Sequence, residues 1–194
     1  MKLIEILSTN EKILSIGDIV SDKNTSHSYI DNFYEKDFSK YKNKSISFLE
    51  IGINNGSCFE MWRNYFTKAE KIIGVDIRED FVLPMFKNLD GVTYYFCDAY
   101  DENFVKTLPK FDIIIDDGSH LLEHQLKFVE LYLNHLKSGG VMVVEDIAVG
   151  NYSNAQDELI SLVKDIEGIT YEWLDFREIK GRDDDILMII RKNN

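Results

Sequence analysis

Short apolar stretches that end abruptly in glycine or acidic residues recur along this 194-residue chain. Residues 48–51 end at Gly52, and residues 111–115 end at the pair Asp116 and Asp117. Apolar runs of this length are typical of strands that are buried on both faces of a parallel sheet. The loops at the carboxyl ends of such strands form the edge where open α/β sheets bind ligands. We therefore expect both loops to open into one site.

Strands alternate with helical segments along the whole chain. We expect strands over residues 46–51, 71–76, 92–97, 111–115, 141–144, 170–176 and 186–191. We expect one or two helices over residues 2–20 and further helices over 29–41, 57–66 and 155–167, with a polar loop over 21–28. We also expect a helix over 81–89 that is interrupted near Pro84, and a long helix over 121–136 that Gly139-Gly140 closes. This alternation predicts a parallel sheet with right-handed crossovers, and the last two strands, which have no helix between them, should form an antiparallel hairpin.

The expected fold is therefore α/β and Rossmann-like. It has a central, mostly parallel seven-stranded sheet, helices on both faces and an antiparallel terminal strand. Residues 1–45 are interpreted as an N-terminal helical segment or lid, and residues 46–194 as the domain that carries the sheet.

Composition and charge argue against several classes of partner. The formal net charge of −12 argues against nucleic acid, because binding to phosphates needs a basic face. The two cysteines, Cys58 and Cys97, are too few for a disulfide framework and favour a reducing compartment. The first residues lack the apolar region of a signal peptide, and no stretch approaches the roughly 20 apolar residues that span a bilayer. We expect a cytoplasmic protein that binds neither nucleic acid nor membranes, with a homo-oligomer left open.

The loop after the first strand is suited to a cofactor that is not a dinucleotide. Gly52 and Gly56 permit positive φ, but their spacing does not match the G-x-G-x-x-G of dinucleotide sites. Glu50 would repel a pyrophosphate and attract a sulfonium. Asp76, which ends the second strand, is placed to accept both ribose hydroxyls, and Asp98, which ends the third, could accept from an adenine amine. This order of acids predicts S-adenosylmethionine.

Two further acidic pairs end the next two strands. Asp116 and Asp117 follow one strand, and Glu145 and Asp146 follow the other. Neighbouring strands lie about 5 Å apart, so four ionised carboxylates would repel one another strongly. A hard divalent cation such as Mg²⁺ relieves this repulsion and prefers carboxylate oxygens. His120 follows Asp117 closely, and an imidazole in that position could act as a general base.

Five short motifs occur in a fixed order between residues 21 and 150. They are Ser21-Asp22-Lys23, His27-Ser28-Tyr29, Glu50-Ile51-Gly52, Asp116-Asp117-Gly118-Ser119-His120 and Glu145-Asp146. Together they resemble the metal-dependent sugar O-methyltransferases of macrolide biosynthesis, the mycinamicin and macrocin type. The resemblance is to class I methyltransferases that use S-adenosylmethionine, and it departs from that family at Cys97-Asp98-Ala99, where Gly-Asp-Gln is common.

The resemblance implies a role for each candidate residue. Asp117, Glu145 and Asp146 would bind Mg²⁺ (or Mn²⁺), and His120 would be the catalytic base. The predicted cofactor-binding residues are Glu50, Gly52, Asn54, Gly56, Ser57, Asp76, Asp98 and Asp116. The expected activity is transfer of a methyl group to a hydroxyl of a sugar or glycosylated small molecule, because vicinal hydroxyls can chelate a metal ion.

Three alternatives remain. A metal-dependent catechol or phenol O-methyltransferase is the first, although catechol enzymes of this fold usually place a lysine near the metal and none lies between Asp112 and Glu123. The glycine spacing disfavours the second, a nucleotide-dependent oxidoreductase. A non-catalytic nucleotide-binding module is the third, and it would not need the acids or His120. We expect His124 and His135 to be packing or surface residues, whereas His27 could line the pocket.

Overall fold

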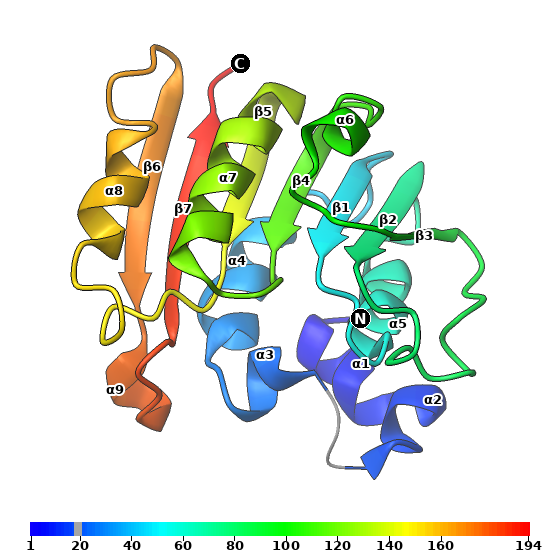
Figure 1. The fold of residues 1–194 in the computed structure, drawn as a ribbon. Coiled ribbons are helices and arrows are strands. Elements are labelled where there is room, and N and C mark those ends of the chain that lie inside the picture. The colour runs from blue at the N-terminus through cyan, green and yellow to red at the C-terminus, as the bar shows by residue number, and fades with distance from the viewer. Residues whose placement is uncertain (18–20) are drawn as a thin grey trace.

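The computed structural model describes residues 1–17 and 21–194. Its strands are β1 (Ser47–Ile51), β2 (Lys71–Asp76), β3 (Val92–Phe96), β4 (Phe111–Asp116), β5 (Leu136–Val144), β6 (Ile169–Asp175) and β7 (Ile186–Lys192). In the described part of the chain these strands form one seven-stranded sheet in the order β3-β2-β1-β4-β5-β7-β6 (Figure 1). The first five pair in parallel, and β7 runs antiparallel between β5 and β6. The predicted fold class and terminal hairpin are confirmed.

The register of the sheet aligns the ends of its central strands. Ile51 of β1 lies opposite Asp116 of β4, and Asp116 lies opposite Val144 of β5. The residues that follow these three therefore lie side by side at one edge. Figure 1 shows the arrowheads of β1, β2 and β4 pointing to this edge, where α1 (Leu3–Thr9) and α3 (Asp22–Thr25) also lie.

Helices cover both faces of the sheet. Neighbouring residues of a strand point to opposite faces, so an apolar strand needs helices packed on each side. Phe48 belongs to a hydrophobic cluster with Leu3 and Trp62, which come from α1 and from α5 (Ser57–Tyr65). Leu49 belongs to a second cluster with Phe128 of α7 (Leu122–Tyr132). Figure 1 shows α7 in front of the sheet and α4 behind it. The other helical segments are α2 (Glu11–Leu14), a π-helix (Ile30–Tyr34), α4 (Glu35–Phe38), α6 (Glu102–Val105), a 3₁₀-helix (Leu133–His135), α8 (Ala155–Ser161) and α9 (Arg177–Lys180).

The prediction of a helix over residues 81–89 is wrong. The segment forms a series of turns instead. Pro84 has no N–H to donate and disfavours the helical conformation of the residue before it. The segment is also tied to the glycine loop, since the backbone N–H of Leu83 donates to the carbonyl oxygen of Asn55 at 3.1 Å.

Several predicted boundaries also differ from the structure. Within the predicted helix over 2–20 lie α1 and α2, and residues 18–20 fall outside the described residues. The helix predicted over 121–136 ends as an α-helix at Tyr132, and Gly140 lies inside β5 instead of marking a helix stop. A Cβ at Gly140 would come 3.0 Å from the carbonyl oxygen of Asp112, so the absence of a side chain lets β5 pack closely against β4 here. The predicted loop over 21–28 contains α3.

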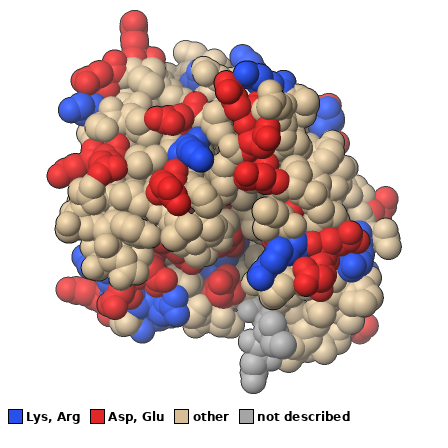
Figure 2. All heavy atoms as spheres, in the orientation of Figure 1, with Lys and Arg blue, Asp and Glu red and all other residues tan. Residues whose placement is uncertain are grey.

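Within the described ranges, no helix has the length and apolar character needed to cross a membrane. Figure 2 shows Lys and Arg side chains scattered among Asp and Glu side chains on the described part of one face of the molecule. The absence of nucleic-acid binding stays a prediction.

Candidate active site

The glycine loop after β1 touches the loop after β4. Gly52 has φ +93°, and a Cβ built on it would lie 1.9 Å from the carbonyl oxygen of Asp117. A side chain of any size is therefore excluded at this position. The carboxylate of Asp76 fixes the same loop, since its Oδ2 accepts from the backbone N–H groups of Ile53 at 2.8 Å and Asn54 at 3.1 Å. The backbone thus brings the predicted donor loop against the predicted metal loop.

Gly52→Ala should destabilise the fold by about 3 kcal/mol, because it combines overpacking with a strained positive φ, each of which costs about 1–3 kcal/mol. Chemical denaturation measures the effect as a change in the free energy of unfolding. Gly150→Ala is the matched control, since a Cβ there would meet no atom within 4 Å. Equal stability of the two variants would show that the contact between the loops is dispensable.

A cavity of about 610 Å³ opens at this edge of the sheet. The predicted site residues that line it are Gly52, Asn54, Asp76, Asp98, Asp117 and His120. The remaining predicted residues are buried and do not line it: Glu50, Gly56, Ser57, Asp116, Glu145 and Asp146. The structure thus brings half of the candidates together around one cavity, while their individual roles stay predictions.

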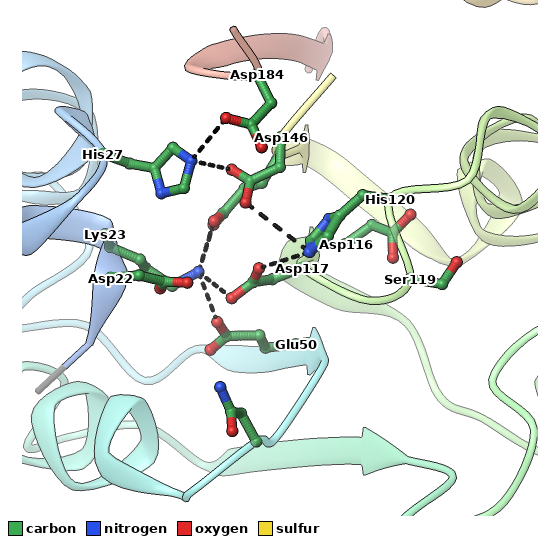
Figure 3. A network of polar contacts seen from close by, with 12 residues as sticks. Asp22, Lys23, His27, Glu50, Asp116, Asp117, Ser119, His120, Asp146 and Asp184 are labelled. Atoms are coloured by element: carbon green, nitrogen blue, oxygen red, sulfur yellow. Dashed lines mark hydrogen bonds and ion pairs between the residues drawn. The ribbon is translucent and has the colours of Figure 1, made fainter. Parts of the chain in front are cut away.

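A buried lysine lies among the acids (Figure 3). The Nζ of Lys23 lies 2.6 Å from Asp117 Oδ2, 2.6 Å from Glu145 Oε2 and 3.1 Å from Glu50 Oε1. The side chains of Lys23 and Glu50 are both 0% exposed. Burial alone lowers the pKa of Lys23, but the charges of Asp117, Glu145 and Glu50 outweigh it and raise that pKa well above its ordinary value. Lys23 is therefore a permanent cation inside the acid cluster.

Two aromatic side chains donate hydrogen bonds to the same carboxylates. The hydroxyl of Tyr34 donates to Glu145 Oε1, and the indole Nε1 of Trp62 donates to Glu50 Oε2 at 2.5 Å. Burial raises the pKa of Glu145 well above its ordinary value and that of Glu50 to about 7, and the charge of Lys23 opposes both shifts. Protein groups thus contact both inner acids, but Glu50 Oε1 accepts no hydrogen bond and is left with the ion pair to Lys23 at 3.1 Å.

The outer acids face His120 and the N-terminal segment. The Nε2 of His120 lies 4.0 Å from Asp117 Oδ1 and 3.8 Å from Asp146 Oδ2. The hydroxyl of Tyr29 donates to Asp146 Oδ1 at 2.6 Å, and His27 Nε2 lies 3.6 Å from the same atom. Figure 3 shows His27 and His120 approaching Asp146 from opposite sides.

Backbone strain is concentrated around this cavity. Among the described residues, three that are not glycine have positive φ: Asn54 at 47°, His120 at 58° and Asp146 at 54°. Such conformations are uncommon and cluster at functional sites, where surrounding contacts hold them in place. Their position at the ends of β1, β4 and β5 supports the assignment of this edge as the site.

A second polar group lies on the other side of the β4 loop. Tyr100 donates to Asp116 Oδ1 at 2.9 Å and stacks on His124 with ring centroids 4.6 Å apart. The hydroxyl of Ser119 lies 2.7 Å from His124 Nδ1. Burial raises the pKa of Asp116 to about 7. His124 packs against Tyr100 and also lines the cavity, so the expectation that it is a packing or surface residue stays a prediction.

Lys23, Tyr29 and Tyr34 are the site residues for which the sequence suggested no role. They contact acids that lie about a hundred residues later, and nothing in local spacing indicates such contacts. The signal was present only in the motifs Ser21-Asp22-Lys23 and His27-Ser28-Tyr29, which belonged to the family resemblance.

The donor set fits a hard divalent cation on the side that faces the cavity. Asp117, His120 and Asp146 offer ligand atoms within 4.8 Å of one another. Mg²⁺ is commonly held by one or two carboxylates with water in its remaining positions, which suits Asp117 and Asp146. Glu145 turns its carboxylate to Lys23, so its role as a ligand stays a prediction.

The family whose description is "Methyltransferase domain" matches residues 49–147, just over half of the chain. The chain belongs to this family. The match begins in β1 and ends just after Asp146, so it contains the glycine loop and both acidic pairs. The predicted methyltransferase fold is therefore confirmed.

Two curated methyltransferases resemble this one in sequence. Demethylmacrocin O-methyltransferase from Streptomyces fradiae is 30% identical over 125 residues, which cover 59% of this chain and 30% of the relative. Mycinamicin VI 2''-O-methyltransferase from Micromonospora griseorubida is 28% identical over 127 residues, with the same coverage of 59% and 30%. The chain thus aligns with less than a third of the length of either relative.

Solved structures show the same fold. The MycE methyltransferase from the mycinamycin pathway, in complex with Mg, SAH and mycinamycin VI, matches 100% of this chain and 55% of its own, with a TM-score of 0.71 and 20% identity. A putative rRNA-methylase from Clostridium thermocellum matches 91% of this chain and 98% of its own, with a TM-score of 0.63 and 15% identity. The fold is shared by methyltransferases whose acceptors differ, so the fold alone does not select an acceptor.

Proposed function

We propose that this methyltransferase uses S-adenosylmethionine and Mg²⁺ to methylate a hydroxyl of a sugar or glycosylated small molecule. One observation carries the proposal: the glycine loop with Asp76 and the Asp117–His120 loop line the same cavity. A methyl donor and a hydroxyl acceptor could therefore meet there. The relatives named above are, by their names, O-methyltransferases of demethylmacrocin and of the 2'' position of mycinamicin VI, which favours a hydroxyl acceptor of this class.

The chain's own residues supply binding and a base. Gly52 and Asp76 would hold the donor, and Asp117 and Asp146 would hold the ion. When bound, the donor would supply an electrophilic methyl group, and the ion would lower the pKa of a hydroxyl that it chelates. His120 is 37% exposed and would take the hydroxyl proton on Nε2. Carboxylates of Asp117 and Asp146 at 4.0 and 3.8 Å would stabilise the imidazolium that results.

Asp76→Ala should weaken S-adenosylmethionine binding at least tenfold. The substitution removes a carboxylate acceptor for ribose hydroxyls, and each hydrogen bond to a charged group contributes about 1.5–3 kcal/mol. It also frees the N–H groups of Ile53 and Asn54, so the glycine loop loosens. Titration calorimetry measures the donor affinity, and thermal unfolding reports the change in stability separately.

Asp165→Ala is the control for this experiment, because Asp165 is an exposed acid beyond α8. Its donor affinity should equal that of the unchanged protein. Tight NADH binding without S-adenosylmethionine binding would overturn the proposed donor and favour the oxidoreductase alternative.

A screen with labelled donor and Mg²⁺ tests the acceptor. It should include sugar nucleotides, glycans, glycosylated small molecules and catechols. Lys23 lies beside the acids, where a catechol enzyme would place its lysine, but its side chain is 0% exposed and bound by three carboxylates. We therefore expect label on a sugar and not on a catechol. Label on catechols alone would reverse the assignment.

The remaining assignments belong to the same proposal. Residues 1–45 would close the site, residues 46–194 would form the methyltransferase domain, and the protein would act in the cytoplasm on a small-molecule or glycan hydroxyl. A homo-oligomer stays open, and size-exclusion chromatography with light scattering measures it.

A further inference from the structure

The carboxylate of Asp117 separates two positions that a cation could take. Its Oδ2 faces inward to Lys23, Glu50 and Glu145, while its Oδ1 faces outward to His120 and Asp146. Glu50, Asp117 and Glu145 offer ligand atoms within 4.8 Å of one another, as the outer group does. The inner position has three carboxylates and no imidazole, so by charge alone it should attract a divalent ion more strongly.

Lys23 fills the inner position. Its Nζ lies within 3.1 Å of a carboxylate oxygen from each of the three acids. Mg²⁺ needs oxygen ligands at about 2.0–2.1 Å, and the ammonium takes the place where such ligands would converge. A lysine and a divalent ion therefore cannot occupy the inner position together.

We propose that Lys23 is a positioning residue that excludes a divalent ion from the inner position and confines it to the outer one beside His120. The inference rests on the proposed function, because it assumes that the outer position serves methyl transfer. The inner position is enclosed, whereas Asp117 and His120 line the cavity. An ion bound inside would lie on the side of Asp117 that faces away from His120.

Contacts of the N-terminal segment position Lys23 and the two acids of the β5 loop. The lysine lies on α3, and Tyr34 of the following π-helix donates to Glu145, which holds this acid turned inward. Tyr29, between them, donates to the Oδ1 of Asp146 and leaves Oδ2 directed at His120. One segment thus points Glu145 inward and Asp146 outward.

Lys23→Met tests the inference on the full chain without donor or acceptor. Mn²⁺ serves as the probe, with affinity measured by titration calorimetry and by the electron paramagnetic resonance of free Mn²⁺. Removal of the ammonium opens a site of three carboxylates, so we expect Mn²⁺ to bind at least tenfold more tightly. The added substitution Glu50→Gln should remove this gain, because Glu50 belongs only to the inner group. Glu50→Gln alone should leave Mn²⁺ affinity within twofold of the unchanged protein.

Two controls separate the loss of the positive charge from a loss of folding. Lys23→Arg retains the positive charge and should keep the original Mn²⁺ affinity. If Lys23→Met is unfolded without ions, circular dichroism should show it folding when Mn²⁺ is added. Unchanged or weaker Mn²⁺ affinity in the folded variant, a gain that survives Glu50→Gln, or failure to fold at saturating Mn²⁺ would each overturn the inference.

Activity provides a second, independent readout. With an accepted substrate, Lys23→Met should turn over at least tenfold more slowly even though it binds the ion more tightly, because the ion has moved inward. A merely structural role would lower ion affinity and turnover together. If the unchanged protein transfers no methyl group at all, the proposed function fails while the Mn²⁺ measurements still decide the role of Lys23.

Discussion

His120→Ala should lower turnover by about 10²–10⁴-fold, the range typical of the loss of a general base. The imidazole faces the cavity beside Asp117 and Asp146, and no other histidine of the described chain contacts both acids. Donor affinity should change little, because the imidazole approaches Asp117 and Asp146, which belong to the predicted metal site. Steady-state kinetics on an accepted substrate measure the first effect, and titration calorimetry the second.

The control for this prediction follows from the structure. His124 stacks on Tyr100 inside the cavity, so His124→Ala is not a neutral comparison. His135 contacts the carbonyl oxygen of Pro109 at the opposite end of β5, and His135→Ala should keep near-normal turnover. Near-normal turnover of His120→Ala would show that the hydroxyl is activated without this base.

Removal of divalent ions with EDTA should abolish turnover, and addition of Mg²⁺ or Mn²⁺ should restore it. Asp117 and Asp146 offer hard oxygen ligands on the side of the cavity, and carboxylates are the ligands that Mg²⁺ prefers. Asp117→Asn and Asp146→Asn should each raise the Mg²⁺ concentration needed for half-maximal turnover. Turnover as a function of added Mg²⁺, after treatment with chelator, measures both effects.

Asp112→Asn is the comparison for the ion requirement. Asp112 lies near the start of β4, at the opposite edge, and pairs with Lys137 at 2.8 Å. Its substitution should leave the Mg²⁺ dependence unchanged. Full turnover in EDTA by the unchanged protein, on any accepted substrate, would remove the metal from the proposed function.

The succession of strands along the chain and the edge that carries the site could be predicted because their signals are local. The run of residues 48–51 ends at Gly52, and the run of residues 111–115 ends in acids, and each pattern is complete within about ten residues. Parallel pairing then brings these ends together wherever the helices lie. The prediction of a helix over residues 81–89 failed because the spacing of the apolar residues there fits a helix. In the structure, Pro84 and the contact with the glycine loop make this segment a series of turns.

The partner of the acids could not be predicted in the same way. Repulsion among Asp117, Glu145 and their neighbours led to the prediction of a divalent cation among them. The sequence could not indicate that part of this charge comes from Lys23, which lies 122 positions before Glu145. Only the folded chain shows that a side chain from the polar segment reaches the inner acids.

The long separation between Lys23 and its acids also sets the order in which the site is assembled during synthesis. Lys23 leaves the ribosome 94 residues before Asp117 and 122 residues before Glu145. Chains grow at about 5–20 residues per second, so the lysine waits roughly 5 to 25 seconds for its partners. The backbone N–H of Ser28 also donates to Asp185, which is made later still. The segment that carries Lys23 is therefore made before its partners and reaches its final place after them, and a chain that has not yet extended to Asp185 has no finished site.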